Sequence, residues 1–158
     1  MTITSEFPPD ATDIEQISPY MTRYWLFDHQ IVVFKMTSVS REAVDVWIDT
    51  VKATMTAWSS DHPYLAIHDM TSEKTALTPY ARARAEELLP LGTRTPGFAA
   101  IVLPGTFVGQ VIRLFMRTQK NQGVHNEIFF TLQEAITWLT TKMSKDIPVE
   151  PDEMTITE

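Results

Sequence analysis

The stretch YLAIHDMTSEKTALTP, residues 64–79, decides the expected fold. Its first part, residues 64–68, is a short apolar run, which favours a buried strand. A loop over residues 69–77 follows. Thr78 then has the side chain of a helix N-cap, and Pro79 stands at the first helical position, where the missing N–H of proline costs nothing. The stretch therefore predicts a strand, a loop and a helix in succession.

Further strands and helices are predicted on both sides of this stretch. Short apolar or β-branched runs predict strands at residues 24–28, 31–36, 98–103 and 127–130. Apolar residues at helical spacing predict four helices, which begin after Ser40, Thr78, Thr106 and Thr131. We expect the second helix to run to about Leu89, where Pro90 and Gly92 close it. The third helix is expected over residues 107–116, which are rich in apolar side chains.

This order of elements, β-β-α-β-α-β-α-β-α, predicts an α/β domain with a mixed sheet of about five strands. The first two strands flank a turn at Asp28, so they are expected to form one antiparallel pair at an edge of the sheet. The later strands alternate with helices, which predicts parallel pairing through right-handed crossovers. The sheet should therefore be mostly parallel.

Charge is spread unevenly along the chain, whose formal net charge is −7. Residues 1–19 and 146–158 contain acids but no Lys or Arg, and they show little periodicity, so both are expected to be acidic tails. A single domain is then expected over residues 20–145, which are nearly neutral overall. This balance, without interleaved basic and aromatic residues, disfavours nucleic acid as a partner.

Several kinds of site are disfavoured because the chain lacks their motifs. It has no Cys, which rules out disulfides, thiol nucleophiles and thiolate metal sites. It has no glycine-rich phosphate loop, no paired metal-binding histidines on a helix and no nucleophile elbow. No apolar run is long enough to span a bilayer, and no signal peptide is expected. We therefore expect a cytoplasmic protein that is not an enzyme and holds no metal or cofactor, with His68 as a packed or capping histidine.

The loop that follows the strand at residues 64–68 is the first candidate site. It joins the carboxyl end of a parallel strand to a helix N-terminus, and open α/β sheets bind ligands on that side. Asp69, Thr71 and Thr78 are the candidate binding residues, and phosphate on a Thr at the N-cap would meet the positive end of the helix dipole. The alternative is a local role, in which Asp69 and Thr71 form a side-chain turn and Thr78 only caps its helix.

A second candidate is a group of cations around the second and third helices, which consists of Arg82, Arg84, Arg94, Arg113, Arg117 and Lys120. These side chains would dock an acidic partner, bind a small apolar or anionic ligand between the two helices, or simply be solvated. The apolar surplus of residues 107–116 fits a buried helix, an apolar pocket or a dimer contact. A homodimer is therefore a further expectation.

The element order and the loop together resemble the STAS family, the anti-sigma factor antagonist or SpoIIAA-like fold, over about residues 20–143. Asp69-Met70-Thr71 looks like the Asp-Leu-Ser of that family at the end of its central strand, and Leu77-Thr78-Pro79 falls where the family has Asp-Ser-Ser. The outline is also similar to the lipid-binding Sec14 (CRAL-TRIO) domain. The resemblance implies a SpoIIAA-like fold and a non-enzymatic regulatory module that docks onto a partner protein through residues 69–78.

The resemblance also implies a phosphorylation switch, although the motif differs at the decisive position. The phospho-acceptor Ser of the family falls on Pro79, and Thr78 matches only the neighbouring Ser. Thr75 or Thr78 would then take the place of the acceptor.

Overall fold

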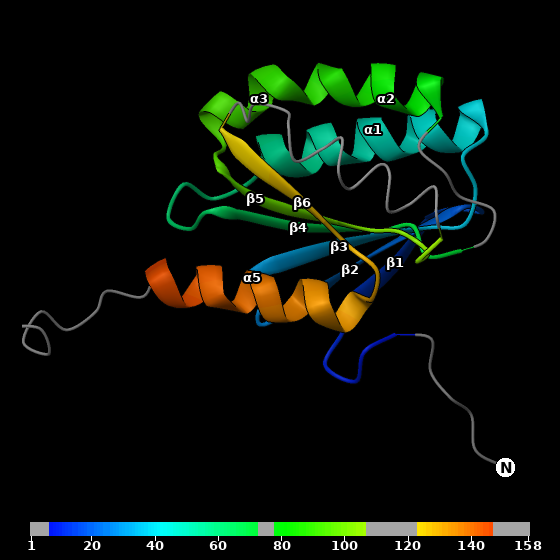
Figure 1. Ribbon diagram of the computed structural model, residues 1–158. Helices are drawn as coiled ribbons and strands as arrows, with labels where there is room; N and C mark the ends of the chain where they lie inside the picture. The colour runs from blue at the N-terminus through cyan, green and yellow to red at the C-terminus, as the bar shows by residue number, and fades with distance from the viewer. Residues whose placement is uncertain (1–6, 73–77, 107–122, 147–158) are drawn as a thin grey trace, which may run out of the picture.

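Six strands form one mixed sheet in the part of the chain that the structure, a computed structural model, describes: residues 7–72, 78–106 and 123–146. The strands are β1 (Thr12–Ser18), β2 (Met21–Leu26), β3 (Ile31–Met36), β4 (Tyr64–Asp69), β5 (Gly97–Val102) and β6 (Val124–Phe129), and they follow one another across the sheet in this order (Figure 1). The pairs β1–β2 and β2–β3 are antiparallel, and the pairs from β3 to β6 are parallel. The expected α/β class and mostly parallel mixed sheet are confirmed.

The sheet nevertheless has one strand and one antiparallel pair more than the sequence predicted. The additional strand, β1, lies within residues 1–19, which were expected to be a tail. β1 is an exposed edge strand, and its pairing with β2 slips between Thr12 and Glu15 and again between Gln16 and Ser18. Such irregularities remove the period of two by which a strand is recognised in a sequence.

The described helices are α1 (Arg41–Thr56), α2 (Pro79–Ala85), α3 (Leu89–Arg94) and α5 (Leu132–Asp146), with a 3₁₀ turn η1 (Glu86–Leu88) between α2 and α3. The prediction that Pro90 and Gly92 end the second helix is wrong, because both residues lie within α3. Pro90 is in the first turn of α3, where proline removes no hydrogen bond. The chain therefore passes through η1 and starts a new helix. The third helix predicted at residues 107–116 falls outside the described residues.

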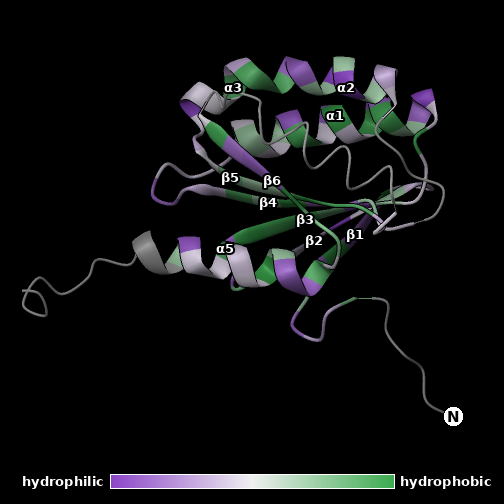
Figure 2. Ribbon diagram, viewed as in Figure 1, coloured by the Kyte–Doolittle hydropathy of each residue, from purple (hydrophilic) through white to green (hydrophobic). Residues whose placement is uncertain are grey.

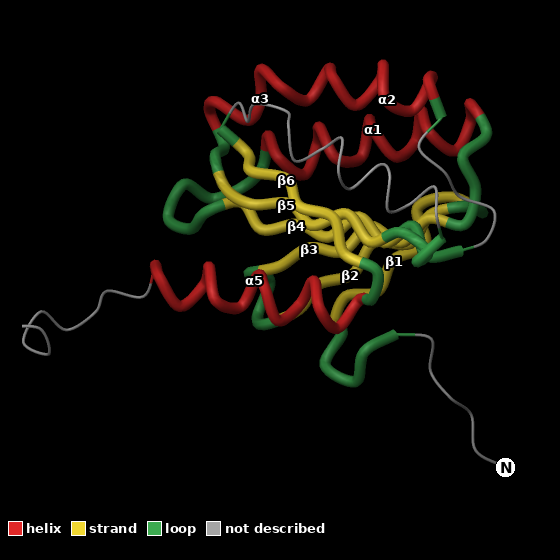
Figure 3. The backbone as a smooth tube through the Cα atoms, viewed as in Figure 1, coloured by secondary structure: helices red, strands yellow, loops and turns green. Residues whose placement is uncertain are grey.

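The helices form a layer on each face of the sheet (Figures 1 and 3). α1, α2 and α3 cover one face and α5 covers the other. Each interface has its own hydrophobic cluster, with Phe34, Trp47, Ile48 and Ala66 on the α1 face and Tyr24, Val33, Ile67 and Leu139 on the α5 face. β4 is buried along its whole length because both of its faces are covered, and hydrophobic colour concentrates on the central strands in Figure 2.

The parallel strands give the sheet two different edges. The carboxyl ends of β3 to β6 meet at one edge, here named the carboxyl edge, and their amino ends meet at the opposite, amino edge. α1, α2 and α5 all begin at the carboxyl edge (Figure 1). A hydroxyl caps each of them: Ser40 accepts from the amide of Ala43 at 3.2 Å, Thr78 from Ala81 at 3.1 Å and Thr131 from Glu134 at 3.1 Å. These three caps confirm the predicted helix starts.

Candidate functional site

Asp69 and Thr71 form one tight turn at the carboxyl edge. Asp69 is the last residue of β4 and is only 3% exposed, whereas Thr71 is exposed. The Asp69 Oδ1 accepts a hydrogen bond from the Thr71 amide at 3.1 Å and another from the Thr71 hydroxyl at 2.7 Å. The carboxylate therefore shapes the start of the loop, as the local interpretation predicted, and Thr71 is the member of the pair that faces solvent.

Thr78 is the N-cap of α2. Its hydroxyl accepts the hydrogen bond from Ala81, and Pro79 occupies the first turn of the helix. Both features follow from the sequence Thr-Pro, because the hydroxyl satisfies an otherwise unpaired amide and proline has no amide to satisfy. The remaining candidate in the loop, Thr75, lies outside the described residues. The structure thus brings Asp69 and Thr71 together and gives Thr78 a separate role at the same edge.

His68 lies next to Asp69 in β4, but its side chain is on the α1 face. Its Nδ1 accepts a hydrogen bond from the indole Nε1 of Trp47 at 3.0 Å, and its ring stacks on Phe34 with the centroids 5.4 Å apart. Burial lowers the pKa of His68 to about 4, so the imidazole is neutral at neutral pH. His68 is therefore a packed core histidine, as expected.

Two polar side chains beside Asp69 were not predicted from the sequence. Alternation along β4 places Asp69 on the same face as Ile67, the α5 face, and Lys35 is its register partner on β3. Tyr24 of β2 is fully buried on this face, and its hydroxyl has no hydrogen-bond partner among the described residues. Burial raises the pKa of Tyr24 above its ordinary range, and the charge of Asp69 adds to the rise. The sequence feature that could have indicated a polar group on this face is Lys35, the single charged residue in the apolar run IVVFKM.

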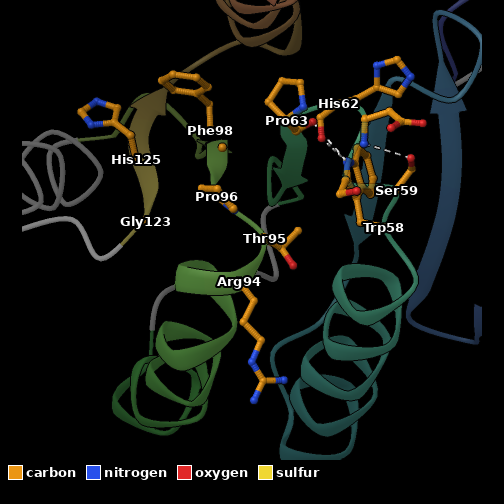
Figure 4. Close-up of a pocket in the computed structure, with 13 residues that line it drawn as sticks. Trp58, Ser59, His62, Pro63, Arg94, Thr95, Pro96, Phe98, Gly123 and His125 are labelled. Atoms are coloured by element: carbon orange, nitrogen blue, oxygen red, sulfur yellow. Dashed lines mark hydrogen bonds between the residues drawn. The ribbon is translucent and has the colours of Figure 1, made fainter.

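Arg94 lies at the other end of the sheet. It ends α3 at the amino edge and lines a shallow hollow of about 600 Å³ together with Trp58, His62, Phe98 and His125. In Figure 4 the Arg94 guanidinium points away from the imidazoles of His62 and His125. The polar groups of the hollow therefore do not converge on one point. Its predicted companions, Arg113 and Arg117, fall outside the described residues.

Arg84 joins α2 to α1 through a network of ion pairs. Its guanidinium contacts Asp45 at 2.5 Å and Asp49 at 3.3 Å on α1, and also Glu87 at 2.7 Å. The hydroxyl of Tyr80 donates to Asp45 at 2.5 Å, and with Arg84 it holds the pKa of that carboxyl below its usual value. The sequence groups Arg84 with the other cations around the second and third helices, as part of a docking face or of a solvated helix face. In the structure the Arg84 guanidinium instead forms ion pairs that join α2 to α1. Arg84 and Asp45 are 39 residues apart, so no local sequence pattern reveals their pairing.

The described residues contain no group of three His, Asp or Glu side chains that could hold a metal ion. Among the helices of the same residues, none has both the length and the apolarity to cross a membrane. No protein-family model, curated protein or solved structure matches the chain, so its function is argued from the geometry of the two edges.

Proposed function

We propose that the chain is a non-enzymatic regulatory module of the STAS or SpoIIAA-like type, which docks onto a partner protein at the carboxyl edge around Asp69, Thr71 and Thr78. The observation that carries the proposal is the common origin of α1, α2 and α5 at this edge. Each helix N-terminus presents the equivalent of about half a positive charge. An edge with several such termini favours acidic groups on a partner.

The three helix starts at this edge differ in the charge of their first turns. α1 and α5 each carry an acid in the first turn, Glu42 and Glu134, whose charge offsets the helix dipole. α2 has no acid in its first turn, and its N-cap is Thr78.

The chemistry of this edge suits recognition better than catalysis. His68 and Asp69 are the buried titratable groups nearest to it, and both are held in hydrogen bonds that stabilise the fold. The exposed Thr71 hydroxyl donates to the Asp69 carboxylate, which also accepts from the Thr71 amide, so this contact holds the turn in shape. A cytoplasmic location and self-association remain predictions that accompany this proposal.

The proposal is tested with one exposed residue at each edge of the sheet. Thr71→Glu places a carboxylate at the carboxyl edge, where it repels acidic groups of a partner, and Ser60→Glu places the same group at the amino edge. Immobilised wild-type and variant chains are exposed to an extract of the source cells, and bound proteins are quantified by mass spectrometry. We expect Thr71→Glu to lose partners that wild type and Ser60→Glu retain. Retention of the same partners by both variants would contradict the proposal.

The hollow at the amino edge supports a second candidate function, the binding of a small apolar or anionic ligand. Trp58 and Phe98 give the hollow apolar walls, and Arg94 is a cation at its rim. Native mass spectrometry of freshly purified protein would detect such a ligand directly. A mass equal to that of the bare chain, with no thermal shift from added lipids or nucleotides, would exclude it.

A further inference from the structure

The segment before β1 lies on the α5 face of the sheet. Phe7 and Ala11 pack against the hydrophobic cluster of that face, and the blue end of the described chain runs below the sheet on the α5 side in Figure 1. The Phe7 ring meets the ring of Tyr24 edge to face, with the centroids 5.2 Å apart and the planes at 72°. The Lys35 ammonium lies 5.7 Å from the centroid of the Phe7 ring. Phe7 thus rests on an aromatic ring and beside a cation.

The surface beneath Phe7 is chemically unlike the rest of the core. It consists of Tyr24, Lys35 and Asp69, which we name the Phe7 seat. Tyr24 is fully buried, yet its hydroxyl lacks a hydrogen-bond partner among the described residues. Asp69 is 3% exposed and is the register partner of Lys35. A buried donor without an acceptor, beside a cation and an aromatic ring, is suited to a group that brings both a ring and an oxygen acceptor.

Phe7 lies outside the paired strands of the sheet. It precedes β1 and is connected to that strand by a short turn. In this turn the Ala11 amide donates a hydrogen bond to the Pro8 carbonyl at 3.0 Å. Its side chain is half-buried, whereas Tyr24 below it is fully buried. No pairing between the described strands would therefore break if the ring left the seat.

We infer that the Phe7 seat is a docking site for an aromatic side chain flanked by carboxylates, on a peptide segment of a partner protein, and that Phe7 fills it as an internal competitor. The Lys35 ammonium lies beside the ring that occupies the seat, and a cation at this position favours acidic neighbours of an aromatic side chain. The occupying segment of this chain has the same composition, since Phe7 stands between Glu6 and Asp10 in the sequence. The seat shares Asp69 with the function proposed above, but the inference does not depend on that function, because the seat lies on the α5 face and is probed without that partner.

The test is binding of the chain's own segment in trans. The probe is a fluorescent peptide with blocked ends and the sequence of residues 2–11, and binding is followed by fluorescence anisotropy. The receptor is the full chain carrying Phe7→Ala, in which the competitor lacks its ring. We expect this variant to bind the peptide at least about tenfold more tightly than wild type, whose seat is free for only a fraction of the time. A peptide in which Phe7 is replaced by Ala is expected not to bind.

Two further variants show where the peptide binds. Phe98→Ala also truncates a half-buried phenylalanine packed on the α5 face, but away from the seat, and it should not increase peptide binding. Lys35→Met added to Phe7→Ala should weaken binding. Equal binding of the two peptides, or no binding by Phe7→Ala, would overturn the inference. Should Phe7→Ala fail to fold, ring-labelled phenylalanine in the wild-type chain serves instead: excess peptide must shift the Phe7 signal in NMR spectra, and an unmoved signal overturns the inference.

Discussion

At the scale of single residues, His68 links the stability of the core to pH. The unfolded chain takes up a proton at this imidazole near pH 6.5, and the folded chain does so only near pH 4. The stability that depends on the neutral ring is complete above pH 6.5 and is lost as the pH falls towards 4, by up to about 3 kcal/mol. We expect the free energy of unfolding in urea to fall less between pH 7 and pH 5 for His68→Gln than for wild type. An equal fall would show that His68 is not buried as described.

Two substitutions of Thr78 distinguish the effect of the helix cap on stability from the effect of a negative charge. Thr78→Ala removes the acceptor for the Ala81 amide and should lower the free energy of unfolding by about 1 kcal/mol. Thr78→Asp supplies another acceptor and adds a negative charge at the positive end of α2, so we expect it to be at least as stable as wild type. Chemical denaturation of the three proteins measures both effects. Equal losses in the two variants would contradict the role of Thr78 as a cap.

The residue-level features that the sequence predicted correctly are local ones. A cap such as Thr78, or a turn such as Asp69 with Thr71, depends on a hydrogen bond between residues at most three positions apart. The surroundings of Asp69 depend instead on strand register, which brings Lys35 beside it from β3. No local sequence pattern contains the register of β3 against β4, so the position of Lys35 beside Asp69 could not be predicted.

At the scale of elements, the close approach of β4 and β5 makes Gly97 necessary. A Cβ atom at this position would lie 1.9 Å from the carbonyl oxygen of Tyr64, and backbone cannot move aside as a side chain does. We expect Gly97→Ala to lower the free energy of unfolding by about 3 kcal/mol or more. Gly105→Ala is the matched control, because its nearest contact would be the side chain of Phe130 at 3.8 Å. Similar urea midpoints for the two variants would contradict the described approach of the strands.

Regular elements were predictable from the sequence, and irregular ones were not. The strand β3 and the starts of α1, α2 and α5 follow from periodicity and caps, which act within one element. The edge strand β1 was missed because bulges and exposed acids hide its alternation. The break between α2 and α3 was misplaced because Pro90 closes a helix or begins one, depending on where the chain must turn to reach β5.

At the scale of the whole molecule, the two edges of the sheet differ in chemistry. The capped starts of α1, α2 and α5 and the turn at Asp69 lie at the carboxyl edge. Aromatic side chains, Arg94 and the shallow hollow lie at the amino edge. The sequence placed its two candidate sites near the same pair of helices. The structure separates Arg94 from Asp69 because α3 ends at the edge opposite to the one where β4 ends.

The central claim, that the carboxyl edge is the docking surface, is tested most directly by photo-crosslinking within the source cells. The photoreactive residue p-benzoylphenylalanine is placed at Thr71 in one chain and at Ser60 in another, since both positions are exposed and they lie at opposite edges. The proposed function predicts a discrete crosslinked protein from Thr71 and none from Ser60. Crosslinks from Ser60 alone, or the same protein captured from both positions, would contradict it.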